Sequence, residues 1–288
     1  MMSWGSSILV GYDATPDGER ALRWAATEAK LRRLPLSVCH AWRWPYPVSY
    51  IDNDGAAIVR RMGQNLLDQG VLRVRDFAPT VTVQAHLADG PADAALLHLA
   101  GEAEMIVVGA HDREDMALGS TALRLPARAE RPVVVVRPGG GDGEHRRVVA
   151  GFDGSSGSDA ALAFAFEEAA VRGWTLRVVY GCWEPSAASE DELNLFADRE
   201  RLRQVRGAEL EQAVASWSTK YPQVDVQTAL TVTPPREAMF EAAETADLVV
   251  VGRRGAGSIG RLRVGATTTA MLMQAPCAVV VVPPAAEI

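Results

Sequence analysis

Glycines and arginines gather in one segment near the end of the chain, GRRGAGSIGRLRVGAT at 252–267. Glycine lets the backbone approach phosphate oxygens and adopt positive φ, and the amides that begin a following helix attract anions. Four arginines give the segment a positive charge suited to a triphosphate: Arg253, Arg254, Arg261 and Arg263. The segment therefore predicts a loop that binds nucleotide phosphates.

The segment also resembles two better-known phosphate-binding motifs, but only in the order of its residues and not in its structural context. Residues 255–260 spell GxGxxG, but they lie well past their strand, and no acid follows about 20 residues on as a dinucleotide site requires. Residues 255–261 approach GxxxxGK, but with arginine in place of lysine and Leu262 where Ser or Thr would hold magnesium. We therefore predict neither function.

The chain carries one pattern twice, about 140 residues apart. Residues 8–38 align without a gap on 148–178, and MIVVG at 105–109 matches LVVVG at 248–252. A repeat this long indicates two whole domains. We expect them at 1–138 and 147–288, joined by a glycine-rich linker at 139–146.

Each half alternates β-branched runs with helical patterns. Strands are expected at 8–12, 36–41, 81–87, 105–109 and 133–137, and at 148–152, 176–181, 224–230, 248–252 and 278–282. Helices are expected at 17–33, 56–77, 158–172 and 190–220, with third helices that start at Pro91 and Pro234. Runs such as VVVV are apolar on both faces, which is typical of parallel sheets covered by helices. The predicted fold class is α/β, with two repeated doubly wound, Rossmann-like or flavodoxin-like domains of five parallel strands each.

Ligands of such sheets bind beyond the carboxyl ends of the strands, where the strand order reverses. Asp13 and Asp153 each follow the first strand of a half, and their carboxylates could accept hydrogen bonds from ribose hydroxyls or an adenine amine. The alternative is that each aspartate only caps the helix that follows.

The first half has an altered loop at 109–121. It is three residues shorter than its counterpart, and Asp112 stands where the middle glycine belongs. Acidic Asp112, Glu114 and Asp115 replace the arginines, and each anion beside a triphosphate costs about 1 kcal/mol or more. We expect this half to bind a nucleoside triphosphate much more weakly or not at all.

Composition excludes several classes of partner. The net charge of −7 and the pI of about 5.3 argue against nucleic acid and anionic membranes. No apolar run approaches the roughly 20 residues that cross a bilayer, and the N-terminal segment lacks the basic region of a signal peptide. We therefore expect a cytoplasmic location. The three cysteines form no CxxC pair and the five histidines are scattered, so no metal site or catalytic residue is predicted.

These features together resemble the universal stress protein family, in which a Gly-x2-Gly-x9-Gly-Ser/Thr loop binds ATP phosphates. Gly252, Gly255 and Gly265 fit that spacing, with Ala266 in place of the Ser/Thr and Thr267 next to it. The likeness covers nearly the whole chain, as a tandem protein. It includes the two strand-ending aspartates, the VCHAW run at 38–42 and the closing VVVV strands. Loss of the hydroxyl at Ala266 is expected to reduce affinity.

The resemblance implies an ATP site in the second half, with Mg²⁺ accompanying the triphosphate. In this family the aspartate after strand one contacts adenosine, and a residue near the end of strand two lines the adenine pocket. The residues so implied are Asp153, Gly181, Gly252, Arg253, Gly255, Gly265, Ala266 and Thr267. The weaker counterpart in the first half comprises Asp13, Ala41, Gly109, Gly119, Ser120 and Thr121.

The function implied is that of an ATP-binding, nucleotide-sensing stress-response regulator that hydrolyses ATP very slowly or not at all. One alternative is a weak ATPase or phosphoryl-transfer enzyme, which needs magnesium ligands and a positioned base. Asp153 could be such a ligand, but no second acid is evident by the loop. Another alternative is a nucleotide-independent scaffold whose glycine loop is structural.

The closing strands predict how the halves associate. Each is a fifth strand at a sheet edge, and an exposed apolar edge favours aggregation unless it is covered. Single-domain members of the family dimerise through this strand, so the resemblance implies an internal pseudo-dimer. Other helical faces would remain free for a homodimer.

Overall fold

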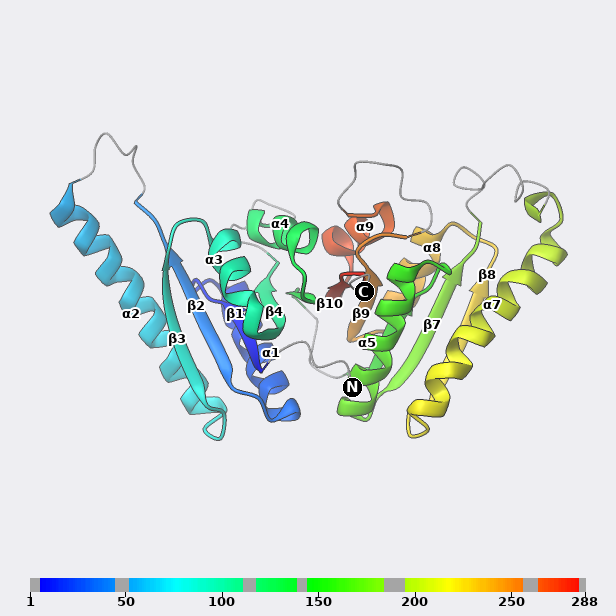
Figure 1. Ribbon diagram of the computed structural model, residues 1–288, viewed down its shortest axis with the longest axis horizontal. Helices are drawn as coiled ribbons and strands as arrows, with labels where there is room; N and C mark the ends of the chain where they lie inside the picture. Colours follow the sequence, from blue (N-terminus) through cyan, green and yellow to red (C-terminus); the bar gives the residue numbers. More distant parts are fainter. Residues whose placement is uncertain are drawn as a thin grey trace. The chain divides into compact units, whose positions relative to one another are not determined.

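The computed structural model describes residues 6–44, 52–110, 118–138, 144–183, 195–255 and 264–284. The chain divides into two compact units, Met1–Pro138 and Gly139–Ile288. Each unit has a parallel β-sheet flanked by helices (Figure 1). The predicted α/β fold class is confirmed.

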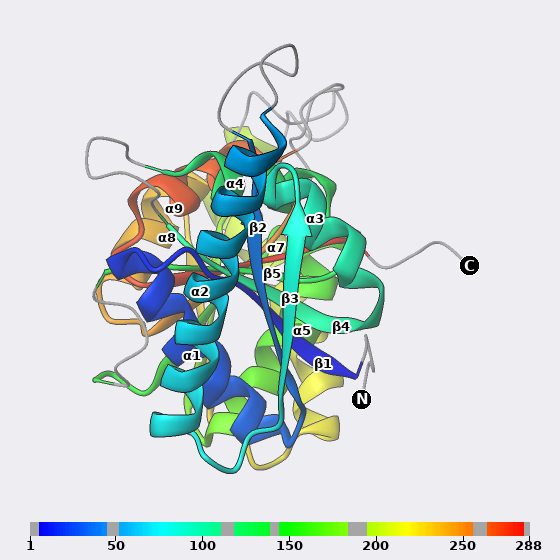
Figure 2. The same cartoon turned by 90° about the vertical axis from the view of Figure 1, so that its left-hand side faces the viewer.

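The first unit alternates strands and helices in chain order. Its strands are β1 (Ser7–Gly11), β2 (Leu36–Trp42), β3 (Val83–Asp89), β4 (Ala103–Gly109) and β5 (Val133–Val136). Its helices are α1 (Pro16–Arg32), α2 (Asn53–Phe77), α3 (Ala92–Leu99) and α4 (Ser120–Arg128), and the short 3-10 helix η2 (Ala100–Glu102) precedes β4. The strands lie side by side in the order β3-β2-β1-β4-β5. Helix α1 packs with α2 and helix α3 packs with α4, and Figure 2 shows α1 and α3 on opposite sides of the sheet.

The second unit repeats this arrangement. Its strands are β6 (Arg147–Gly151), β7 (Thr175–Gly181), β8 (Val226–Thr231), β9 (Leu248–Gly252) and β10 (Ala278–Val282). Its helices are α5 (Ser156–Arg172), α7 (Arg199–Lys220), α8 (Pro235–Ala243) and α9 (Ala266–Gln274). The strands follow the order β8-β7-β6-β9-β10, and the pairs for which the register is known are parallel.

The order of each sheet reverses beside its first strand. Strand β1 pairs with β2 on one side and β4 on the other, and β6 lies likewise between β7 and β9. The helices that follow these strands begin at the same edge of the sheet, because all strands point the same way. A ligand cleft is expected at this edge.

Local interactions explain where the first helix of each unit begins. In α5 the side chain of Ser155 accepts a hydrogen bond from the amide of Ser158, and Thr15 serves α1 in the same way. Later in α5 the fully buried Glu168 carboxylate pairs with Arg172 one turn on, at 2.9 Å. This pair helps to anchor the helix because a buried charge needs a partner.

Several predicted boundaries were wrong by a few residues. Strands β3 and β8 begin at Val83 and Val226, because the amides of Val81 and Val224 bond back to the ends of the preceding helices. Pro91 and Pro234 lie at the N-cap positions with extended backbone, so α3 and α8 begin one residue later.

Other predictions fall partly outside the described residues. The helix expected at 190–220 is observed as Arg199–Lys220, and the start of the predicted range, 190–194, lies outside the description. The same holds for 139–143 of the expected linker. Within the described part of the chain, no helix is long and apolar enough to cross a membrane.

Candidate functional site

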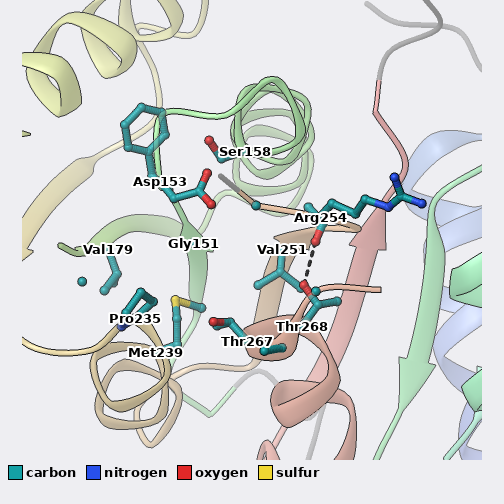
Figure 3. A pocket seen from close by; sticks show the side chains of 16 residues that line it. Gly151, Asp153, Ser158, Val179, Pro235, Met239, Val251, Arg254, Thr267 and Thr268 are labelled. Carbon is teal, nitrogen blue, oxygen red and sulfur yellow. Dashed lines mark hydrogen bonds between the residues drawn. The ribbon is translucent and has the colours of Figure 1, made fainter. Parts of the chain in front are cut away.

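A cleft opens at the reversal point of the second unit, where the ends of β6, β7 and β9 meet the first turns of α5, α8 and α9. Figure 3 shows the side chains around it. The cavity measures about 120 Å³. Its lining comprises Gly151, Phe152, Asp153, Ser158, Val179, Gly181, Pro235, Met239, Val251, Gly252, Arg254, Gly255, Gly265, Ala266, Thr267 and Thr268.

Asp153 is held rigidly at the rim of this cleft. Its Oδ1 accepts hydrogen bonds from the amide of Ser155 at 3.0 Å and from the hydroxyl of Ser155 at 2.6 Å. Ser155 is itself the N-cap of α5, so the aspartate orients the capping residue and does not cap the helix directly. The expectation that Asp153 itself caps the helix is therefore wrong, because Ser155 is the capping residue. The same holds for Asp13, which bonds the capping residue Thr15 in the first unit.

Two glycines of the loop allow its backbone to lie close to neighbouring parts of the protein. A Cβ at Gly252 would lie 2.5 Å from the carbonyl oxygen of Gly157, and a Cβ at Gly255 would collide with Oδ2 of Asp153. A Cβ at Gly265 would make only ordinary contacts, the nearest 3.6 Å away at Cα of Arg254. The first two glycines are thus required by packing within the protein, whereas Gly265 has space that a ligand could use.

The start of α9 closes the cleft on the opposite side from Asp153. Gly265 is its N-cap with no side chain to bond the first amides, and its own amide donates to the carbonyl of Arg253 at 2.9 Å. Thr268 donates its hydroxyl to the carbonyl of Gly252 at 2.7 Å, which ties the helix to the end of β9. In Figure 3 the Asp153 carboxylate and the Thr267 hydroxyl border the same space. The cleft thus has an acceptor on one side and a helix N-terminus on the other.

Most residues predicted for this site come together in the cleft. Seven of them line it: Asp153, Gly181, Gly252, Gly255, Gly265, Ala266 and Thr267. Arg253 is not among the lining residues, and its amide extends the sheet by bonding to the carbonyl of Val282 at 2.8 Å. Arg254 lines the cleft, but its guanidinium points away from Asp153 in Figure 3. Arg261 and Arg263 lie outside the described residues.

Sequence reasoning missed the apolar wall of the cleft. Val179, Pro235 and Met239 provide it, and Val179 lies opposite Gly151 in the register of β6 and β7. Pro91 and Pro234 mark the starts of the third helices in the sequence, and they could have indicated this wall, because the start of that helix packs on the cleft. Gly181 illustrates this contact, since a Cβ there would lie 2.7 Å from Cα of Pro235.

Tryptophans near the ends of β2 and β7 do not reach the clefts. A Cβ at Gly63 of α2 would lie 3.1 Å from Cβ of Trp42, and Trp183 stacks edge-on against Phe196 at 5.8 Å. Neither tryptophan appears among the described residues that line a cleft. Trp42 thus packs against α2 at Gly63, and Trp183 packs against the segment that precedes α7.

The first unit has a smaller cleft, of about 90 Å³, at the equivalent place. Five of the six residues predicted there line it: Asp13, Ala41, Gly109, Gly119 and Thr121, whereas Ser120 does not. The remaining lining consists of Gly11, Tyr12, Gly18, Cys39, His40, Ala92, Leu96, Val108 and Ala122. The amide of Gly119 bonds to the carbonyl of Ala110 at 2.7 Å, as Gly265 does to Arg253. Asp112, Glu114 and Asp115 lie outside the described residues.

Tyr12 and His40 of the first cleft are held by contacts within the protein. His40 is buried, and its Nδ1 lies 2.8 Å from the carbonyl oxygen of Tyr12. The Tyr12 hydroxyl donates to Glu19 at 2.6 Å, and burial and this carboxylate raise the pKa of Tyr12 to about 12. Burial raises the pKa of the Cys39 thiol to about 11. The tyrosine and the thiol therefore stay neutral near pH 7 and are unsuited to acid–base or nucleophilic chemistry.

Metal ligands are scarce around both clefts. Among the described residues, no group of three His, Cys, Asp or Glu side chains could hold a metal ion. A second acid does lie near Asp153: the pKa of Asp159 is raised by partial burial and by the negative charge of Asp153. The sequence offered no sign of this pairing, because Asp159 belongs to the first helix and not to the loop.

Known proteins match the chain over nearly its whole length. The family model for the universal stress protein family matches residues 6–137 and again 144–283. Universal stress protein Rv2623 of Mycobacterium tuberculosis is 30% identical over 96% of this chain and 97% of its own, and Rv2005c of the same organism is 28% identical over 95% and 96%. A crystal structure of a universal stress protein from Archaeoglobus fulgidus matches with a TM-score of 0.70 and 19% identity, over 99% of this chain and 100% of that one. The chain therefore belongs to the universal stress protein family, with one family domain in each unit.

Proposed function

We propose that the second unit binds ATP in the cleft between Asp153 and the start of α9, and that the protein acts as a nucleotide-sensing stress-response regulator. The observation that carries this proposal is the meeting of three features in one cavity. A fixed carboxylate, an apolar wall and an uncapped helix N-terminus surround the same space. These features correspond to the ribose, the base and the phosphates of a nucleotide.

Each part of the ligand has a partner in this arrangement. Asp153 accepts hydrogen bonds from the ribose hydroxyls, and Val179 and Met239 cover the base. The phosphates lie beside Gly265, where the first amides of α9 and the Thr267 hydroxyl donate to them. Mg²⁺ accompanies the triphosphate. Its ligands would come from phosphate oxygens and water, because the described residues offer no cluster of three ligands.

The central test is Gly265→Val, measured by calorimetric titration with ATP. The valine fits the protein because a Cβ at this position meets nothing closer than 3.6 Å, but its methyl groups fill the space assigned to phosphate. Binding of ATP is expected to disappear while the melting temperature stays near that of the parent. Gly207→Val on α7 is the matched control, because a Cβ there also meets its nearest atom at 3.6 Å. Unchanged ATP affinity in a folded Gly265→Val protein would refute the assignment.

The same titration addresses the first unit. We propose one tight ATP site per chain, because the first cleft is smaller and its loop is three residues shorter. Two equivalent sites, or one site that survives Gly265→Val, would contradict this proposal.

The second candidate function is slow ATP hydrolysis. This reaction needs a second acid beside Asp153, and Asp159 is the candidate, because partial burial and the charge of Asp153 raise its pKa, although Asp159 does not line the cleft. Phosphate release by the parent that exceeds the background of Gly265→Val would establish it. A nucleotide-independent scaffold is the third candidate, and adenine nucleotide released on denaturing the purified protein would exclude it.

A further inference from the structure

We propose that Gly157, in the first turn of α5, is a positioning residue for the phosphate loop of the second unit. It lies outside the glycine pattern of that loop and does not line the cleft. This inference rests on the proposed ATP site and adds a specificity determinant to it: Gly157 decides whether a triphosphate, and not merely a nucleoside, can be held.

Gly157 lies close to the backbone of Gly252 and Arg254, at the start of the loop. A Cβ at Gly157 would collide with the carbonyl oxygen of Arg254. From the other direction, a Cβ at Gly252 would lie 2.5 Å from the carbonyl oxygen of Gly157 and 2.7 Å from its carbonyl carbon. The end of β9 and the first turn of α5 are therefore in direct backbone contact. A side chain at residue 157 would push the Arg253–Arg254 backbone outward.

The backbone of Arg253 and Arg254 determines the geometry of the cleft where the phosphates are proposed to bind. Arg253 accepts the hydrogen bond from the amide of Gly265, and this bond places the N-terminus of α9. On the other side, Gly255 lies directly against Oδ2 of Asp153. Moving this segment would shift the helix amides relative to the carboxylate. The apolar wall of Val179, Pro235 and Met239 belongs to β7 and α8 and would stay in place.

The first unit shows the same position filled. Asp17 aligns with Gly157, and its side chain is buried, 4% exposed, and paired with Arg20. Gly109 at the end of β4 packs against it, since a Cβ at Gly109 would lie 2.7 Å from both the carbonyl carbon and the oxygen of Asp17. The unit with a side chain at this position is also the one with the shorter loop. The two units thus differ both at residue 17/157 and in the length of the loop, whereas the bond from the Gly119 amide to the Ala110 carbonyl is kept.

The experiment compares ATP with adenosine, because adenosine has no phosphate and senses only the nucleoside part of the cleft. The variants are Gly157→Ala, which adds a Cβ, and Gly157→Asp, which reproduces the first unit. Ser156→Asp is the control, because it adds the same charge one residue away at an exposed position of the same turn. All are made in an Ala41→Trp background, which fills the first cleft so that binding reports the second one.

Both Gly157 variants are expected to weaken ATP binding by about 10- to 100-fold, the value of one charge-assisted hydrogen bond. Adenosine affinity should stay within about twofold of the background protein, and Ser156→Asp should keep most of its ATP affinity. Equal weakening of ATP and adenosine, or unchanged ATP binding by Gly157→Asp, would overturn the proposal. A background protein that binds ATP no more tightly than adenosine would refute the proposed function itself. This outcome is known before any variant is compared.

Discussion

At the residue scale, Asp153 combines two tasks through its two oxygens. Oδ1 holds Ser155 and thereby the start of α5, while Oδ2 lies on the side of Gly255 and the loop. Local structure and the proposed ligand binding therefore depend on the same carboxylate. Replacing it by alanine would confuse the two effects.

Asp153→Asn separates them. The amide oxygen can still accept from Ser155, so the melting temperature is expected to change little. The amide nitrogen is a donor where ribose hydroxyls need an acceptor, so ATP should bind roughly tenfold more weakly. Titration and thermal melting measure the two effects, and Asp13→Asn in the first unit is the matched control. A folded variant with parental ATP affinity would show that Asp153 does not belong to the proposed binding site.

At the scale of elements, the start of α5 links stability to the cleft. The Ser155 hydroxyl accepts from the amide of Ser158 at 3.2 Å and donates to Asp153 at 2.6 Å. Ser158 lines the cleft, so the cap lies in the wall of the site. The first turn of the helix and the orientation of Asp153 are therefore set together.

Ser155→Ala should lower both stability and ATP affinity. Loss of an N-cap hydroxyl costs about 1 kcal/mol of unfolding free energy, measured by denaturant titration. Thr15→Ala in the first unit removes the equivalent cap and should cost a similar amount without affecting ATP. If Ser155→Ala leaves ATP affinity unchanged, the cap and the carboxylate act independently.

At the scale of the whole molecule, two units of one fold carry different clefts. We propose that they associate as a pseudo-dimer through the closing strands β5 and β10, each the last strand in the order of its own sheet. Both strands are runs of valine, and an apolar edge left open would pair with other chains.

Val281→Lys tests this association by placing a charge on β10. It is expected to cause precipitation or to replace a single melting transition by separate ones. Val251→Lys, at the paired position of the neighbouring strand β9 and 4% exposed, controls for burying a charge within the unit. A soluble Val281→Lys protein with the parental melting curve would mean that the units meet through another surface.

The sequence alone determined the fold class and most of the second cleft. Apolar runs such as 248–252 must be buried on both faces, and the repeat of Gly-x-Asp after the first strand marks the same edge of both sheets. The tertiary structure alone revealed that Arg254 turns its guanidinium away, that Met239 and Pro235 form the wall, and that Gly157 lies against the backbone of Arg254. These contacts join segments far apart in the chain. Hydrophobic periodicity and loop spacing describe neighbours along the sequence, so they cannot specify which backbone atoms meet across a parallel sheet.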